Sequence, residues 1–115
     1  MSTIHDLQQK LASFADDRDW SQFHTPKNLC CSISIEAAEL LEIFQWQDSR
    51  LPLDESSRER ASQEIADVFI YLLMLSRALE IDLEAATYDK MRLNALNYPI
   101  DKSKGNCKKH SEFTE

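Results

Sequence analysis

The chain has 115 residues, a formal net charge of −7 at pH 7, one glycine and three prolines. This length suits one domain with a modest core, and the shortage of turn-forming residues favours an all-α class over a turn-rich β fold. The acidic charge argues against nonspecific nucleic-acid binding, which needs a surplus of lysine and arginine. We therefore expect no nucleic-acid partner, and we expect any phosphate ligand to need a metal ion.

The sequence has no pattern typical of a secretory signal or of a membrane-spanning segment. No basic stretch followed by an apolar segment opens the chain, and the longest apolar run, Val68 to Leu75, is far shorter than a membrane span. The three cysteines are an odd set without the spacing of a disulfide framework. These features predict a soluble, cytoplasmic protein with no membrane partner.

The first half of the chain predicts two helices. Apolar residues at helical spacing from Ile4 onward indicate an amphipathic helix that ends near Asp16. Pro26 is favoured in the first turn of a helix, and the apolar spacing after it predicts a second helix as far as about Trp46. The polar segment 48–57, which contains a proline, is expected to be a connection.

The second half predicts two more helices. A third should begin within residues 54–57 and run to Leu79, and its central segment is apolar nearly all round. Asp82 can cap a fourth helix over 83–97. A four-helix bundle of this size would leave part of the third helix uncovered, so we expect a second copy of the chain to complete the bundle.

The predicted domain covers residues 1–99, because Tyr98 and Pro99 end the fourth helix. Residues 100–115 are polar and have little to bury, so they are expected to form a mobile C-terminal tail.

Two acidic pairs at the same spacing are the most informative feature. Glu36 and Glu39 fall in "EAAE" on the second predicted helix, and Glu64 and Asp67 fall in "EIAD" on the third. Residues three apart lie one turn apart on one helix face, so each pair forces two like charges together. Asp67 has almost only apolar neighbours in sequence and is expected to be buried, where an unpartnered charge would be costly.

Four carboxylates from two antiparallel helices can enclose divalent cations. An oxygen-only ligand set suits Mg²⁺, with Mn²⁺ as a substitute, better than zinc or iron. The Glu-x-x-His pairs of di-iron bundles are missing here. The alternative that stays open is a noncatalytic helical interaction module, in which the same acids bind an ion for stability only.

The segments around these acids resemble the MazG-type all-α nucleoside triphosphate pyrophosphohydrolases, and most closely their dCTP pyrophosphatase branch. The resemblance rests on "EAAELLEIFQW" and "EIADVFIYLLML", with "RDWSQFHTPKNL" before them and "DKMRLNALNYP" after them. It implies that Glu36, Glu39, Glu64 and Asp67 are the metal-binding and catalytic residues. It also implies hydrolysis of a nucleoside triphosphate to a monophosphate and pyrophosphate as nucleotide-pool sanitation, and a dimer or a tetramer built as a dimer of dimers.

A further set of residues is expected to bind the nucleotide. Flat or aromatic side chains suited to a base are Trp20, Phe23, His24, Trp46 and Tyr71. Polar residues that resemble the family's phosphate and sugar contacts are Lys90, Asn94 and Asn97, and Lys27 and Asn28 are expected to contribute. Packing alone also accounts for Phe23 and Trp46, and solvation accounts for Lys90. The base stays open, with dUTP and dATP as alternatives to dCTP.

Overall fold

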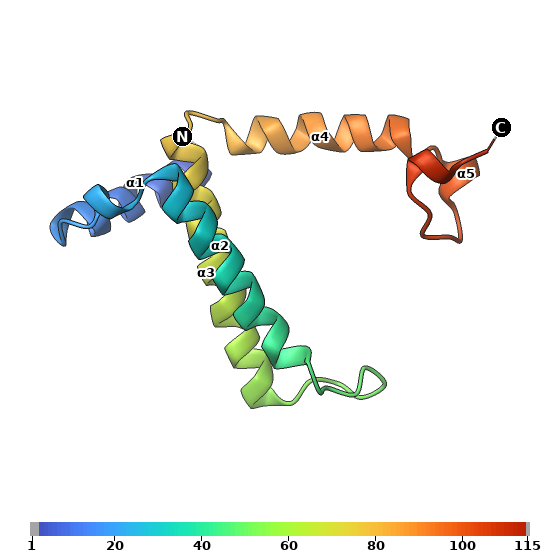
Figure 1. Ribbon diagram of the computed structural model, residues 1–115, viewed down its shortest axis with the longest axis horizontal. Helices are drawn as coiled ribbons and strands as arrows, with labels where there is room; N and C mark the ends of the chain where they lie inside the picture. Colours follow the sequence, from blue (N-terminus) through green and yellow to red (C-terminus); the bar gives the residue numbers. More distant parts are fainter. Residues whose placement is uncertain (1–2, 115) are drawn as a thin grey trace. The chain divides into compact units, whose positions relative to one another are not determined.

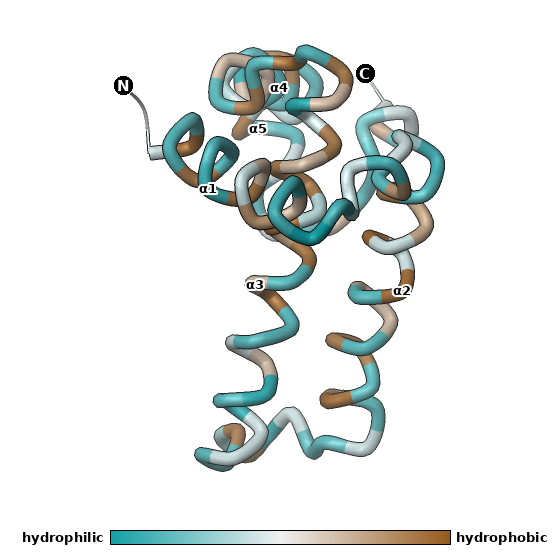
Figure 2. The backbone as a smooth tube through the Cα atoms, turned by 90° about the vertical axis from the view of Figure 1, so that its left-hand side faces the viewer, coloured by the Kyte–Doolittle hydropathy of each residue, from teal (hydrophilic) through white to brown (hydrophobic). Residues whose placement is uncertain are grey.

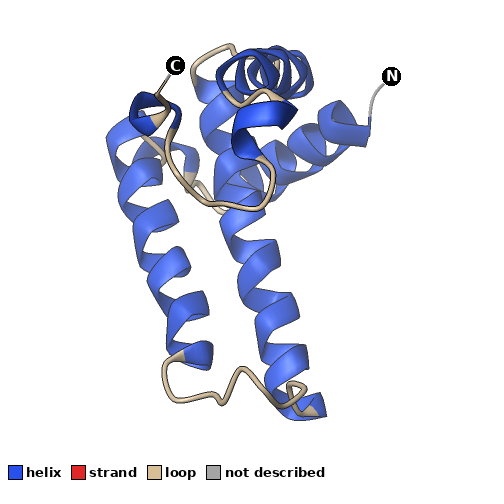
Figure 3. Cartoon of the chain, turned by 90° about the vertical axis from the view of Figure 1, so that its right-hand side faces the viewer, coloured by secondary structure: helices blue, strands red, loops and turns tan. Residues whose placement is uncertain are grey.

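The computed structural model describes residues 3–114 and contains helices and loops, with no strand among these residues (Figure 1, Figure 3). The α-helices are α1 (Thr3–Asp17), α2 (Pro26–Phe44), α3 (Glu55–Ala78), α4 (Leu83–Asn97) and α5 (Ile100–Ser103). Two short 3₁₀ helices are η1 (Ser21–Phe23) and η2 (His110–Glu112). The predicted all-α class is confirmed. The chain divides into two compact units, Met1–Ile81 and Asp82–Glu115.

Helices α2 and α3 pack side by side along their length and form the centre of the first unit (Figure 2). Apolar residues recur along both helices, and the two most buried side chains are Leu29 on α2 and Leu73 on α3, which are 2% and 1% exposed. Helix α1 packs against α3 and contributes the buried Ala15. This small core holds α2 and α3 in a fixed register.

Polar side chains define where three helices begin. Thr25 accepts a hydrogen bond from the backbone N–H of Asn28 before α2, and Asp54 accepts one from Ser57 before α3. Asp82 accepts a hydrogen bond from the N–H of Ala85, which confirms its predicted role as the cap of α4. Such caps satisfy N–H groups that have no partner inside the helix, and each stabilises its helix by about 1 kcal/mol.

Helices α1 and α3 end in the same backbone motif. Trp20 N–H donates to the carbonyl of Ala15, and Ile81 N–H donates to that of Ser76. The residues before them, Asp19 and Glu80, both have a φ of 56°, in the left-handed region usually occupied by glycine at this position. The α1 motif turns the chain so that Trp20 packs edge-on against Phe14, with ring centroids 5.8 Å apart.

Two predicted boundaries differ from the structure. Helix α2 ends at Phe44, two residues before the predicted Trp46, which lies in the turn that follows. Helix α3 ends at Ala78, with Leu79 as its C-cap. Asp67 is half-buried, so the prediction that it is buried was wrong. The reason is that its apolar neighbours in sequence, such as Ile65 and Phe69, lie on the opposite face of α3 and do not cover it.

That face of α3 is apolar and uncovered. Ile65, Phe69 and Leu72 recur at helical spacing and are all exposed, and we call them the α3 stripe. Among the described residues, no helix is long and apolar enough to cross a membrane.

In the second unit, the segment after α4 folds back on Tyr98. The Tyr98 ring lies edge-on to His110 and to Phe113, at centroid distances of 5.5 and 5.8 Å. Residues 100–114 therefore contain α5 and η2, and the boundary at residue 99 stays a prediction. Helix α4 exposes several large apolar side chains: Tyr88, Met91, Leu93 and Leu96.

Candidate active site

Three of the four predicted acids come together between α2 and α3. Glu36 on α2 and Glu64 and Asp67 on α3 each offer one carboxylate oxygen, and these oxygens all lie within 4.8 Å of one another. All three side chains are half-buried. The cluster exists because the acids occupy facing turns of α2 and α3, two helices that pack against each other.

Two oxygens of this cluster lack partners. Glu36 Oε2 and Glu64 Oε2 are buried and make no hydrogen bond. A buried carboxylate oxygen without a partner is destabilising, and a cluster of three acids adds charge repulsion. A divalent cation between α2 and α3 would satisfy both oxygens and offset the charge, so the donor set fits a hard metal ion.

Glu39, the fourth predicted acid, is exposed and lies outside this group of three. Its carboxyl nonetheless affects the pKa of Glu36, which lies one turn earlier on α2. Burial is the largest cause of a raised pKa at Glu36, and the neighbouring carboxyls of Glu39, Glu64 and Asp67 act in the same direction; together they raise this pKa to about 7. Without a cation, Glu36 is therefore partly protonated at neutral pH.

Tyr71 lies on α3 one turn after Asp67 and is half-buried. Residues four apart share a helix face, so Tyr71 follows the acidic residues along α3. Its role in binding the nucleotide stays a prediction.

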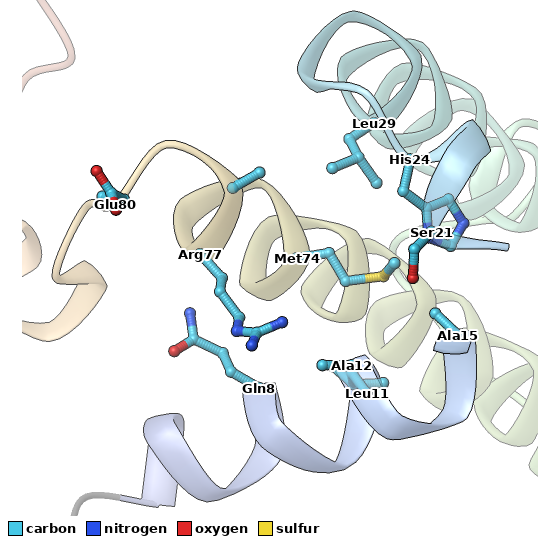
Figure 4. Close-up of a pocket in the computed structure, with 11 residues that line it drawn as sticks. Gln8, Leu11, Ala12, Ala15, Ser21, His24, Leu29, Met74, Arg77 and Glu80 are labelled. Atoms are coloured by element: carbon cyan, nitrogen blue, oxygen red, sulfur yellow. The ribbon is translucent and has the colours of Figure 1, made fainter. Parts of the chain in front are cut away.

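A pocket of about 450 Å³ opens between α1, η1, the start of α2 and the end of α3 (Figure 4). Leu29 and Met74 line it, and they lie seven residues from Glu36 and Asp67 respectively. Seven residues make nearly two full turns, so the pocket lies on the same helix faces as the acids and about 10 Å along the helices. His24, one of the predicted binding residues, also lines this pocket.

The other predicted residues of the first unit are more dispersed. Trp20 packs on Phe14, and Trp46 is 88% exposed in the turn after α2. Asn28 uses its side-chain N–H to bond the carbonyl of Phe23, at 2.9 Å, so part of its polar capacity stabilises the turn before α2. Lys27 and Phe23 are exposed.

Three predicted residues lie in the second unit. Lys90 and Asn94 are exposed on α4, and Asn97 at its end is half-buried. Their spacing places them on one face of α4, and their role in binding stays a prediction.

Sequence reasoning missed two polar residues of the pocket, Gln8 and Arg77, and the buried Ser76 that accepts a hydrogen bond from Gln8. Gln8 donates from Nε2 to the carbonyl of Leu73 and to Ser76 Oγ, both at 3.0 Å. A signal was available, because Gln8 interrupts the apolar face of α1 at the spacing of Ile4 and Leu11. The partner residues on α3 could not have been identified without the packing of α1 on α3.

Comparisons with known proteins show the family of the chain. The MazG-like family matches residues 31–113. The dCTP pyrophosphatase 1 proteins of Bos taurus and Homo sapiens are each 39% identical to the chain, over 96% of this chain and 68% of theirs. The crystal structure of a pyrophosphatase from Archaeoglobus fulgidus is similar with a TM-score of 0.79 and 45% identity, covering 86% of this chain and 94% of that one. On the strength of the family match and of relatives this similar, the chain belongs to the MazG-like family.

Proposed function

We propose that this nucleoside triphosphate pyrophosphohydrolase cleaves dCTP or a related deoxynucleoside triphosphate into the monophosphate and pyrophosphate, with Mg²⁺ held by Glu36, Glu39, Glu64 and Asp67. The observation that carries the proposal is the pair of buried, unpartnered oxygens of Glu36 and Glu64 in a cluster of acids. The names of the relatives, dCTP pyrophosphatase 1 and pyrophosphatase, support the reaction and the substrate class.

The choice of Mg²⁺ rests on the ligand type. The cluster offers only carboxylate oxygens, which favour Mg²⁺ or Mn²⁺ over softer metals. When bound, such ions offset the charge of a triphosphate and activate water for attack on phosphorus.

The four acids have different environments and so different roles. Glu36, Glu64 and Asp67 converge and are the ligands that the geometry supports best. Glu39 is exposed beside them, so its carboxylate is available to orient a water molecule and to accept its proton. Tyr71, one turn from Asp67, is placed to donate a hydrogen bond from its hydroxyl to a phosphate or to the sugar.

The pocket beside Leu29 and Met74 is the proposed site of the base. It lies about 10 Å along the helices from the acids, on the same faces, so a nucleotide can extend from one to the other. Its lining is mixed, with apolar side chains from three helices and a few polar groups, as expected for a small-molecule site. His24 contributes there, and Trp20 lies in the preceding turn.

The remaining predicted contacts stay part of the proposal. Lys90, Asn94 and Asn97 share one face of α4 and carry donors suited to phosphate and sugar oxygens. Lys27 and Asn28, at the start of α2, carry donors of the same kind. Trp46 is almost fully exposed, which leaves its ring available to a ligand.

The oligomeric state is proposed from exposed apolar surface. The α3 stripe (Ile65, Phe69, Leu72) is uncovered in the first unit, and large apolar side chains are exposed on α4. Exposed apolar surface on a helix marks contact sites between chains, and a homodimer or a dimer of dimers would bury it.

The test is the kcat/KM for each of the common dNTPs and NTPs in the presence of Mg²⁺. The highest value is expected for dCTP. A clear preference for dUTP or dATP would overturn dCTP as the proposed substrate but would leave the proposed reaction unchanged. Metal-dependent stability without turnover of any nucleotide would instead favour a noncatalytic helical module.

A further inference from the structure

The pocket that we propose for the base contains a side-chain amide whose orientation is fixed, and the inference below rests on that proposed function. Gln8 lies on α1 and lines the pocket, with Arg77 from the last turn of α3 (Figure 4). Ser76, beside Arg77, is buried and is hydrogen-bonded to Gln8.

Two acceptors determine which way the Gln8 amide faces. Its Nε2 lies 3.0 Å from the carbonyl oxygen of Leu73, which can only accept, so this end of the amide must be the NH₂ group. The Ser76 hydroxyl donates to the same Leu73 carbonyl at 3.0 Å, so it accepts from Gln8. Both Nε2 hydrogens are therefore used within the protein.

The amide oxygen is consequently left for a ligand. Among residues 3–114, no hydrogen bond ends on Gln8 Oε1. This oxygen can only accept a hydrogen bond, and rotating the amide to present NH₂ instead would place two acceptors, Oε1 and the Leu73 carbonyl, against each other.

The second polar group, Arg77, can only donate. Its guanidinium carries several N–H donors and no acceptor. The other polar residues that line the pocket are Ser21, His24 and Glu80. Among the residues that line the pocket, Gln8 thus offers an acceptor of fixed identity and Arg77 offers donors.

We propose that Gln8 is a specificity-determining residue that selects bases with an exocyclic amine next to a ring-nitrogen acceptor. In cytosine, the amine donates to Gln8 Oε1 while the ring nitrogen and the carbonyl accept from Arg77. Adenine has the same order of donor and acceptor. Uracil and hypoxanthine replace the amine with a carbonyl oxygen, which would face Gln8 Oε1 without a hydrogen bond, and this mismatch is unfavourable. Ser76 acts as a positioning residue through Gln8.

The experiment measures binding and turnover separately on the Mg²⁺-loaded protein. Isothermal titration calorimetry gives the ratio of the affinities for dCMP and dUMP. The group that would face Gln8 is an amine in dCMP and a carbonyl oxygen in dUMP. The variant is Gln8→Met, which keeps the length of the side chain and removes the acceptor. Gln9→Met is the matched control, because Gln9 is the next residue of α1, is exposed and does not line this pocket.

Gln8→Met is expected to lower the preference for dCMP over dUMP by about tenfold, mainly by weakening dCMP binding. Ser76→Ala is expected to lower it by a smaller factor, and Gln9→Met to leave it unchanged. An equal loss of affinity for both nucleotides in Gln8→Met, or no loss at all, would overturn the role of Gln8.

Turnover of dCTP and dUTP by the unmodified protein tests the proposed reaction separately from the proposed role of Gln8 in base selection. If neither is hydrolysed while dCMP is still preferred and the preference depends on Gln8, the proposed reaction fails and the base selection stands. If dCTP is hydrolysed and Gln8→Met keeps the full preference, the reaction stands and the base selection fails.

Discussion

A carboxylate oxygen of Glu36 lies within 4.8 Å of one from Asp67, although the two residues belong to different helices. Like charges at this distance repel, and the burial of Glu36 Oε2 without a partner adds to the cost. This contact lowers the stability of the folded protein, and such a cost is typical of a site that binds a ligand of opposite charge. The contact therefore links the packing of α2 and α3 to metal binding.

Replacing Asp67 by Asn should abolish most of the activity and leave the fold intact. The change removes one charge from the proposed metal site at nearly constant volume, and it also relieves repulsion in the metal-free protein. We expect kcat/KM for the best nucleotide to fall by at least about a hundredfold, with an unchanged circular dichroism spectrum.

The control for Asp67→Asn is Glu59→Gln, which neutralises an exposed acid of the same helix. Its activity should equal that of the unmodified protein. Equal activity of both variants would remove Asp67 from the metal site.

The stability of the metal-free protein should depend on the protonation of Glu36. Its pKa is about 7 in the folded protein and near 4.5 in the unfolded chain, so the folded state holds a proton more tightly between these values. The free energy of unfolding should consequently fall as the pH rises from about 4.5 to about 7. Thermal melting in chelator across this pH range measures the effect.

Adding Mg²⁺ should reverse this loss of stability above pH 7, because the ion binds the ionised carboxylates of the folded state. In Glu36→Gln, the fall with pH in chelator should be reduced. A melting temperature in the unmodified protein that rises steadily with pH in chelator would argue against the raised pKa of Glu36.

Leu73 and Trp46 should separate stability from binding. Leu73 is 1% exposed between the helices, so Leu73→Ala should lower the free energy of unfolding by about 3 kcal/mol. Trp46 is 88% exposed, so Trp46→Ala should change it by less than about 0.5 kcal/mol. Chemical denaturation of both variants measures these changes.

If Trp46 contacts the nucleotide, Trp46→Ala should still raise KM or alter the preference among nucleotides. Unchanged kinetics in this stable variant would leave Trp46 without a role in binding.

The α3 stripe should mediate assembly. Phe69→Glu places a charge in the middle of exposed Ile65 and Leu72, and we expect it to shift the protein from an oligomer to a monomer. Sedimentation velocity measures the mass, which is 13.3 kDa for one chain. Gln63→Glu, at an exposed polar position of α3, serves as the control. A monomeric unmodified protein would contradict the proposed contact.

The helices were predictable because their limits are encoded locally. Pro26 in the first turn of α2 and the Asp82 cap of α4 depend only on neighbouring residues, and both are in the structure. The end of α2 was predicted two residues too late, since Trp46 continues the apolar spacing but lies beyond Phe44, the last helical residue. No helix-stopping residue lies between Phe44 and Trp46 to mark this end.

The acids and the pocket show the limit of such reasoning. The repeated spacing of the acidic pairs predicted that all four acids converge, but only Glu36, Glu64 and Asp67 do. The exposure of Glu39 depends on how α2 is rotated against α3. The bond from Gln8 to Ser76 joins residues 68 positions apart in the chain. Such contacts depend on tertiary packing, which local spacing does not encode.

The most direct test of the central claim, that the acids between α2 and α3 hold the metal needed for hydrolysis, is product analysis of dCTP incubated with the protein in Mg²⁺ and in chelator. We expect dCMP and pyrophosphate in equal amounts with Mg²⁺, and no product in chelator. Equal product formation in chelator, or release of inorganic phosphate and dCDP instead, would contradict the account.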